Sequence, residues 1–195
     1  MNVFLDTETT GLPSKNANWK TDYMRFPYMV QLSWKCSNED TVHDYIIKPE
    51  GYNIPINSTK IHSISTAKAL NEGIDMPIVL LELLKYCCIA DKIIGHNLYF
   101  DISIIKANYL RLCKGSIIGL EALNNTLHKS KRIDTMMKTI KYCSIKQPNS
   151  KRFKYPTLTE LHKKLFNCSF DAHNSKEDVL ATERCFNELV KLRII

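Results

Sequence analysis

The segment Val3-Phe4-Leu5-Asp6-Thr7-Glu8-Thr9-Thr10-Gly11-Leu12 decides the fold of this 195-residue chain. Its apolar start predicts a buried strand, and the threonines and glycine that follow predict a loop. Asp6 and Glu8 stand two positions apart where the strand ends. Because residues i and i+2 of a strand point to the same face, we expect both carboxylates to converge on one point.

Two carboxylates that converge in this way repel each other unless a cation lies between them. Carboxylate oxygens are hard ligands, which suit Mg²⁺ or Mn²⁺. A D-x-E pair is expected roughly once by chance in a chain of this length, so the pair alone does not establish a metal site. Its position after an apolar strand and before Thr-Thr-Gly-Leu makes it a candidate.

A third acidic candidate, Asp101, follows the predicted strand Lys92-Ile93-Ile94-Gly95. Apolar residues recur at helical spacing beyond that strand, and Asn97 is suited to cap the helix. Asp101 then lies near the first helical turn, where the helix dipole favours an ionised carboxylate. The local sequence leaves two readings open, a helix-stabilising acid or a metal ligand.

The segment Ala172-His173-Asn174-Ser175-Lys176-Glu177-Asp178 carries the last candidates. Asn174 followed by Glu177 resembles a capping box, so we read Glu177 as a cap and not as a ligand. His173 then lies just outside the helix, and Asp178 lies within its first turns. A single histidine is more often structural than catalytic, and His173 is a candidate only because of the acidic residues around it.

The remaining pattern predicts strands first and then helices that alternate with further strands. That order favours an α/β sheet with mixed strand directions. We expect strands at residues 3–6, 29–36, 41–47, 92–95 and 131–134, a loop at 12–28, and helices at 77–89, 98–109, 157–166 and 176–192. Because no repeat, low-complexity tract or linker is found, we expect a single domain over residues 1–195.

The bulk composition fits a soluble globular protein that binds a polyanion. The chain is 44% hydrophobic and 24% charged, with a formal net charge of +7 and a pI of about 9.0. Its seven cysteines form no C-x-x-C pair, so we expect free thiols and neither a zinc module nor a disulfide framework. No apolar run is long enough to cross a bilayer, and no signal peptide is recognised. We therefore expect an intracellular, cytoplasmic protein (nucleoid or nuclear in a eukaryote) and no membrane partner.

Residues 141–156 contain five cations with three aromatic residues between them. Cations with aromatics suit the phosphates and bases of a single strand. A solvated surface loop is the alternative, and it is the better reading for any one lysine. The residues that we assign to strand contact are Lys151, Arg152 and Lys154. His62 is a further candidate, although its local sequence favours a surface histidine before a helix.

Taken together, these segments resemble the DEDDh exonucleases, the family of the bacterial proofreading subunit. The similar segments are residues 6–12, 61–65, 95–101, 133–135, 158–161 and 173–182. Each motif is modest alone, but the ordered set spans nearly the whole chain and is specific. One departure is Ser63, which stands where glycine is common in the family.

The resemblance implies a ribonuclease H-like fold, with a five-stranded mixed sheet flanked by α-helices. It implies two divalent metal ions held by Asp6, Glu8, Asp101 and Asp178. Two such ions about 4 Å apart can activate water and stabilise the leaving oxygen in phosphodiester hydrolysis. His173 is implied as the general base, because histidine can accept a proton near neutral pH. The residues implied beside the terminal nucleotide are Thr9, Leu12, His62 and Phe100.

The expected activity is 3′→5′ hydrolysis of single-stranded or frayed DNA ends to nucleoside 5′-monophosphates. One alternative is an exoribonuclease, because related enzymes trim RNA with the same fold and ligands. Another is a non-catalytic nucleic-acid-binding module, although an intact set of five residues argues against it. The Thr-Glu-Thr-Thr-Gly-Leu form resembles the proofreading branch, so we prefer DNA over RNA, with a role in DNA repair or proofreading. The sequence offers no C-terminal tether for a polymerase, which favours a freestanding enzyme and leaves docking through the body open.

Overall fold

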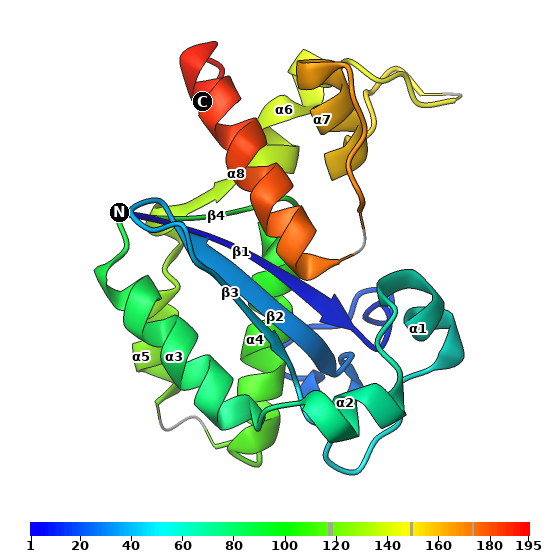
Figure 1. Ribbon diagram of the computed structural model, residues 1–195, viewed down its shortest axis with the longest axis vertical. Coiled ribbons are helices and arrows are strands. Elements are labelled where there is room, and N and C mark those ends of the chain that lie inside the picture. Colours follow the sequence, from blue (N-terminus) through cyan, green and yellow to red (C-terminus); the bar gives the residue numbers. More distant parts are fainter. Residues whose placement is uncertain (117–118, 149, 173) are drawn as a thin grey trace.

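A five-stranded mixed sheet with strand order β3-β2-β1-β4-β5 lies at the centre of the protein (Figure 1). The computed structural model describes residues 1–116, 119–148, 150–172 and 174–195. The strands are β1 (Asn2–Thr9), β2 (Met29–Cys36), β3 (Val42–Ile46), β4 (Lys92–Gly95) and β5 (Arg132–Asp134). The first three pair antiparallel, whereas β1, β4 and β5 pair parallel. The expected α/β sheet of mixed direction is confirmed.

Eight α-helices and two short 3-10 turns surround this sheet in the described part of the chain. The helices are α1 (Ile56–His62), α2 (Thr66–Glu72), α3 (Met76–Ile89), α4 (Leu98–Leu112), α5 (Leu120–Thr126), α6 (Thr135–Cys143), α7 (Leu158–Phe166) and α8 (Ser175–Lys191). The 3-10 turns are η1 (Tyr23–Arg25) and η2 (Lys129–Lys131). Figure 1 shows α8 crossing one face of the sheet while α4 lies behind the other face.

Alternation along β1 divides its side chains between these two faces. Val3 and Leu5 are buried in the large core that includes α3 and α4. Phe4 points the other way and packs with Val179 and Phe186 of α8, its ring 5.6 Å from that of Phe186. Because the side-chain period of a strand is two, the same alternation directs the polar residues at the end of β1.

Most predicted elements are present, and the missed ones share a physical cause. The strands at 29–36 and 92–95 have the expected bounds, and the strand expected at 131–134 begins at Arg132. The sequence analysis did not predict α1, α2, α5 or α6, which are only 7 to 9 residues long. Helices of about two turns show a period poorly and depend on tertiary packing. The equally short α7 was predicted, and a capping box of Thr157 and Glu160 marks its start.

Two predicted helix caps differ in detail from the structure. Asn97 precedes α4, but its φ of 69° is left-handed and its side chain makes no cap hydrogen bond. Its backbone N–H instead donates to Asp134 Oδ1 at 3.0 Å. Asn174 does cap α8, because its side chain accepts from the N–H of Lys176 at 3.1 Å. A reciprocal hydrogen bond to the Glu177 side chain is not found among the described residues. The N-cap of α8 there consists of the one bond to Asn174.

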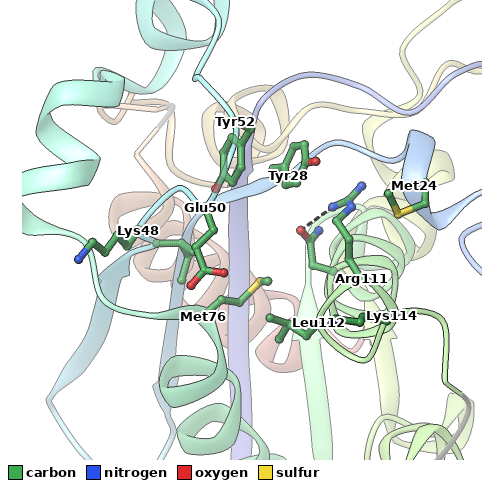
Figure 2. A pocket seen from close by; sticks show the side chains of 11 residues that line it. Met24, Tyr28, Lys48, Glu50, Tyr52, Met76, Arg111, Leu112 and Lys114 are labelled. Atoms are coloured by element: carbon green, nitrogen blue, oxygen red, sulfur yellow. Dashed lines mark hydrogen bonds between the residues drawn. The ribbon is translucent and has the colours of Figure 1, made fainter.

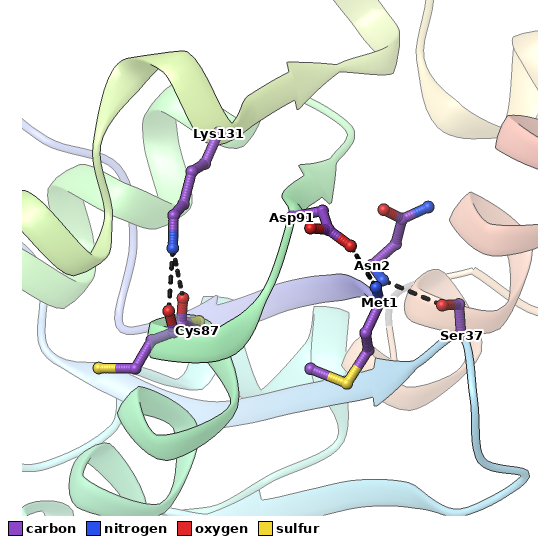
Figure 3. Close-up of polar contacts among 7 residues, drawn as sticks. Met1, Asn2, Ser37, Cys87, Asp91 and Lys131 are labelled. Carbon is purple, nitrogen blue, oxygen red and sulfur yellow. Dashed lines mark hydrogen bonds and ion pairs between the residues drawn. The ribbon is translucent and has the colours of Figure 1, made fainter.

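Polar contacts tie the edges of the sheet to the helices (Figure 3). Lys131 donates to the carbonyls of Cys87 and Cys88 at 3.2 and 3.1 Å, near the C-terminal end of α3 where unpaired carbonyls favour a cation. The backbone N–H of Asn2 donates to Ser37 Oγ at 2.9 Å, which holds the start of β1 beside the end of β2. All seven cysteines are unpaired, as expected.

Arg111, near the end of α4, anchors the long segment between β1 and β2. Its guanidinium donates to the carbonyls of Tyr23 and Phe26 and to Asn108 Oδ1. Its carbon Cζ lies 4.1 Å from the centre of the Tyr28 ring, and that ring stacks on Tyr52 at 3.9 Å. Both tyrosines line a cavity of about 320 Å³. Figure 2 shows its lining side chains from close by. One arginine thus orders a loop that has little secondary structure of its own.

We expect Arg111→Lys to lower the stability of the protein by about 1–3 kcal/mol. A lysine keeps the charge but loses the planar fork that reaches two carbonyls and stacks on an aromatic ring. Urea unfolding followed by circular dichroism measures the change. Arg25→Lys, an exposed arginine in the same loop, is the matched control. Equal stability of both variants and the parent would contradict the anchoring role.

Candidate functional site

Three carboxylates from two elements meet at the end of β1. Each of Asp6, Glu8 and Asp178 offers one oxygen, and these oxygens all lie within 4.8 Å of one another. Asp6 and Glu8 share the face of the sheet that α8 covers, because they keep the parity of Phe4 along β1. Asp178 comes from the first turn of α8. The predicted convergence of Asp6 and Glu8 is confirmed, and Asp178 joins them.

Ser175 fixes the start of α8 against the strand that carries two of these carboxylates. Its hydroxyl donates to the backbone carbonyl of Asp6 at 2.9 Å, and its side chain is fully buried. The N–H of Asp178 donates to the carbonyl of Asn174 at 2.9 Å, which starts the helical ladder one turn earlier. The position of Asp178 therefore follows from where α8 begins. Sequence reasoning missed Ser175, whose partner lies 169 residues away.

Asp101 approaches the cluster from the opposite face of the sheet. Its Oδ1 accepts hydrogen bonds from the backbone N–H and the hydroxyl of Thr7, at 3.1 and 2.8 Å. Thr7 lies between Asp6 and Glu8, so its side chain points toward α4 while theirs point toward α8. Asp101 is only 3% exposed. Sequence reasoning missed Thr7, because nothing local marks a threonine as the partner of a distant carboxylate.

The pKa values show that this concentration of negative charge is costly without a cation. Burial raises the pKa of Asp6 well above its ordinary value, and Asp101, Asp178 and Glu8 raise it further. Burial and the nearby Asp178 raise the pKa of Glu8 to about 7. Burial raises the pKa of Asp101 to about 8, although the hydrogen bonds from Thr7 oppose the shift. A divalent cation would relieve the repulsion, and oxygen ligands of this kind fit Mg²⁺ or Mn²⁺.

His173 lies outside the described residues, so its predicted role as a base stays a prediction. The residues on either side of it are described, and Asn174 caps the helix that carries Asp178. The histidine therefore precedes α8 directly in sequence. The prediction that a helix starts after Asn174 is confirmed.

His62 does not lie on the surface, which corrects its locally favoured reading. It is the last residue of α1 and is 3% exposed. Its Nδ1 accepts from the N–H of Ile64 at 3.2 Å, and burial lowers its pKa while the backbone of Thr9 partly opposes this. The structure thus brings His62 and Thr9 close together. Ser63 has a φ of 61°, a left-handed conformation that explains why glycine is common there.

The other residues expected near a terminal nucleotide border the same end of β1. Thr9 donates through its hydroxyl to the carbonyl of Gly11 at 2.6 Å, which tightens the turn after the strand. Leu12 follows this turn and is 84% exposed. Phe100, next to Asp101, is half-buried against the core.

The basic segment lies apart from the carboxylates. Figure 1 shows the connection between α6 and α7 extending outward as a thin two-stranded projection, and Lys146 pairs with Phe153 in it. Lys151 and Arg152 are exposed, whereas Lys154 forms an ion pair with Glu160 at 2.7 Å. One of the three predicted strand contacts therefore already has a carboxylate partner.

Comparisons with known proteins agree with this architecture. A family model described as an exonuclease (RNase_T) matches residues 3–186. The fold is similar to that of E. coli exonuclease I in complex with a dA16 oligonucleotide, with a TM-score of 0.69, 17% identity, and 99% of this chain and 41% of that chain covered. The zinc-bound form of the complex between E. coli exonuclease I and single-stranded DNA gives a TM-score of 0.67, 18% identity and coverage of 98% and 40%.

A further structure of exonuclease I, described as suggesting how processivity is achieved, matches with a TM-score of 0.68, 17% identity and coverage of 99% and 42%. The chain thus spans about two fifths of the length of these exonuclease I chains. No curated protein sequence matches the chain. Within the described ranges, every helix is too short or too polar to span a membrane.

We expect the stability of the metal-free protein to fall as the pH rises from about 5 to about 8. The folded-state pKa values of Asp6, Glu8 and Asp101 exceed their ordinary values near 4, so the folded state binds more protons in this window. Stability that depends on protonated carboxyls is lost as the pH rises through the folded pKa. Thermal unfolding in chelator measures the effect, and saturating Mg²⁺ or Mn²⁺ should reduce it.

Asp6→Asn isolates the contribution of the cluster to this pH dependence. Burial lowers the pKa of His62 and His96, which favours folding as the pH rises, so the difference between variant and parent is decisive. The variant should unfold at a higher temperature than the parent at pH 8. Its stability should also fall less steeply as the pH rises. Asp40→Asn, at an exposed turn, should match the parent. If the stability of Asp6→Asn fell more steeply with pH than that of the parent, repulsion among the carboxylates would be refuted as the cause.

Proposed function

The chain belongs to the DEDDh exonuclease family of the ribonuclease H-like superfamily, and we propose that it removes nucleotides from 3′ ends of single-stranded or frayed DNA. The observation that carries the proposal is the set of carboxylate oxygens from Asp6, Glu8 and Asp178 within 4.8 Å. Asp101 is bonded to Thr7, the residue between Asp6 and Glu8. The products would be nucleoside 5′-monophosphates. A trimming or repair enzyme fits this activity.

The four carboxylates would hold two divalent ions, Mg²⁺ or Mn²⁺. Such ions supply charge neutralisation at phosphorus and assistance to both the attacking and the leaving oxygen. The protein residues determine where the two ions could bind. Thr7 orients Asp101, and Ser175 fixes the start of the helix that bears Asp178. Because these partners are buried, the carboxylates are ordered before substrate arrives.

His173 would act as the general base. In the sequence it stands next to Asn174, the N-cap of the helix that carries Asp178. A base in this place takes the proton of the attacking water, and its ordinary titration range allows this at neutral pH. The burial of His62 and its contact with the N–H of Ile64 suit it instead to shaping the pocket.

Thr9, Leu12, His62 and Phe100 would surround the terminal nucleotide, and the exposed Leu12 would pack against its base. Lys151, Arg152 and Lys154 would contact the strand upstream. DNA is preferred over RNA because the first motif resembles the proofreading branch and because structures of exonuclease I, a protein of similar fold, contain DNA oligonucleotides. Exoribonuclease activity is the second candidate, since the same carboxylates serve either sugar.

We expect Asp178→Asn to reduce hydrolysis of a 5′-labelled single-stranded DNA by at least about 10³-fold, because several kcal/mol of metal assistance is lost. Asp171→Asn, an exposed acid shortly before α8, is the matched control and should leave the rate unchanged. Gel analysis of product lengths in Mg²⁺ or Mn²⁺ gives both rates. Near-normal turnover by Asp178→Asn in saturating metal would remove this residue from the ligand set.

We expect His173→Ala to lower turnover by roughly 10²–10⁴-fold, the usual contribution of a positioned general base. Binding of Mn²⁺, measured by calorimetry, should stay close to that of the parent. A variant that loses Mn²⁺ binding but keeps its rate per bound ion would show that His173 is a ligand and not a base.

Matched DNA and RNA oligonucleotides with 5′ labels distinguish the proposed substrate classes. We expect one-nucleotide steps from the 3′ end, faster on DNA than on RNA, and no cutting of closed circular single-stranded DNA. Faster trimming of the RNA would select the exoribonuclease candidate. Cutting of the circle by pure protein would indicate an endonuclease, and binding of both oligonucleotides without hydrolysis would leave only a binding module.

A further inference from the structure

His96 joins three segments of the chain beside the carboxylate site. It follows β4 directly and opens the segment that leads to Asp101. Its Nδ1 lies 3.0 Å from the hydroxyl oxygen of Thr135, the first residue of α6. Its Nε2 lies 2.9 Å from the carbonyl oxygen of Pro156, which stands shortly before α7. Because a carbonyl oxygen can only accept, Nε2 carries a proton and donates the hydrogen bond to Pro156.

The backbone that carries His96 is packed tightly next to the carboxylates. Thr135 is fully buried, and its hydroxyl lies 3.1 Å from the carbonyl oxygen of Gly95. A Cβ added at Gly95 would lie 3.2 Å from the carbonyl oxygen of Leu5, so the end of β4 packs directly on β1, one residue before Asp6. The place of His96 relative to the carboxylates is therefore fixed by buried contacts.

On its other side His96 holds the basic projection, which we define as residues 144–156 between α6 and α7. Figure 1 shows this segment extending outward, and the N–H of Lys154 donates to the carbonyl of Ile145 at 2.9 Å between its two strands. Within the described part of the chain, its other hydrogen bonds and its ion pair stay inside the projection or reach α6 and α7. The bond from His96 to Pro156 is thus its direct polar link to the backbone beside the carboxylates.

We propose that His96 is a positioning residue for strand binding, whose bond to Pro156 holds the basic projection at a fixed place relative to the carboxylates. This inference rests on the proposed function, which assigns strand contacts to the exposed Lys151 and Arg152 of the projection. A strand that is held both at the carboxylates and at the projection binds tightly only if the two sites keep the spacing that the strand spans, as for any pair of linked binding sites. His96 maintains that spacing and touches neither the strand nor the reacting atoms.

The first experiment measures strand affinity without cutting, in the Asp178→Asn background, by fluorescence anisotropy with a long labelled oligothymidylate. His96→Gln keeps a donor at the place of Nε2, whereas His96→Asn keeps a polar group only at the place of Nδ1 and cannot reach Pro156. We expect His96→Gln to bind like its parent and His96→Asn to bind about 5–30-fold more weakly, the effect of losing one or two cation contacts to phosphate. Equal affinity of His96→Asn and its parent would overturn the proposal.

A double-mutant cycle shows whether His96 acts through the projection. Lys151→Gln together with Arg152→Gln should weaken binding and reduce the salt slope by about 1.4, because each cation on a single strand contributes about 0.7. His96→Asn should then weaken binding little further. An equal effect of His96→Asn in both backgrounds would mean a merely structural role and would overturn the proposal. Lys48→Gln together with Lys85→Gln, at two other exposed lysines, is the matched control for charge.

Thermal unfolding checks that each variant is folded. If His96→Asn does not fold, Thr135→Val replaces it in both experiments, because it removes the other hydrogen bond of the same ring and keeps a side chain of similar shape. Without that bond the ring is free to turn away from Pro156, so this variant should also weaken strand binding. A folded Thr135→Val that binds the long strand like its parent would then overturn the proposal.

Hydrolysis separates this inference from the proposed function. The nitrophenyl ester of thymidine 5′-monophosphate has no upstream phosphates, so the parent and His96→Asn, both with Asp178 intact, should hydrolyse it equally. On the long strand His96→Asn should raise KM and leave kcat nearly unchanged. A loss of ester hydrolysis in His96→Asn would show that His96 acts on the carboxylates, which overturns the proposal. Failure of the parent to hydrolyse either substrate would refute the proposed function, whereas the affinities and the cycle would still decide the role of His96.

Discussion

Repulsion among Asp6, Glu8, Asp101 and Asp178 is the constraint on which the rest of the structure depends. Four carboxylates stay close together only if the backbone around them cannot relax. The protein meets this need with buried partners: Thr7 holds Asp101 through two hydrogen bonds, and the hydroxyl of Ser175 ties α8 to β1. Burial, and after it the neighbouring carboxylates, raise the pKa values of Asp6 and Glu8, so keeping both ionised is costly. The folding free energy of the core therefore maintains a site that is unfavourable by itself.

Helices on both faces of the sheet enclose that site. On one face, α8 brings Asp178 to the strand while Val179 and Phe186 pack against Phe4. On the other face, α4 supplies Asp101 and then continues into the core with a nearly unbroken run of buried residues. Arg111, farther along α4, orders the loop that follows the first motif. The same helices therefore place the acidic side chains with their first turns and pack against the sheet with their later turns.

The sequence allowed prediction of the parts of the fold that local patterns govern. Strands at 29–36 and 92–95 have distinct apolar runs, and Asp6 and Glu8 share a face because of strand geometry alone. The partners of Thr7 and Ser175 could not be predicted, since they lie 94 and 169 residues away. His62 was expected at the surface because the segments that bury it are distant in sequence. Asp101 was ambiguous locally, because a helix-stabilising acid and a metal ligand have the same sequence pattern, and only the resemblance to a family favoured the ligand.

The alternation along β1 has a consequence for how this site can vary. Neighbouring side chains of β1 point to opposite faces of the sheet. Asp6 and Glu8 point toward α8, and Thr7 points toward α4. A one-residue insertion or deletion within the strand would exchange the two sets and direct carboxylates into the apolar layer that holds Val3 and Leu5. Variation in length is therefore excluded from β1 and confined to the connections, such as the exposed segment between α6 and α7.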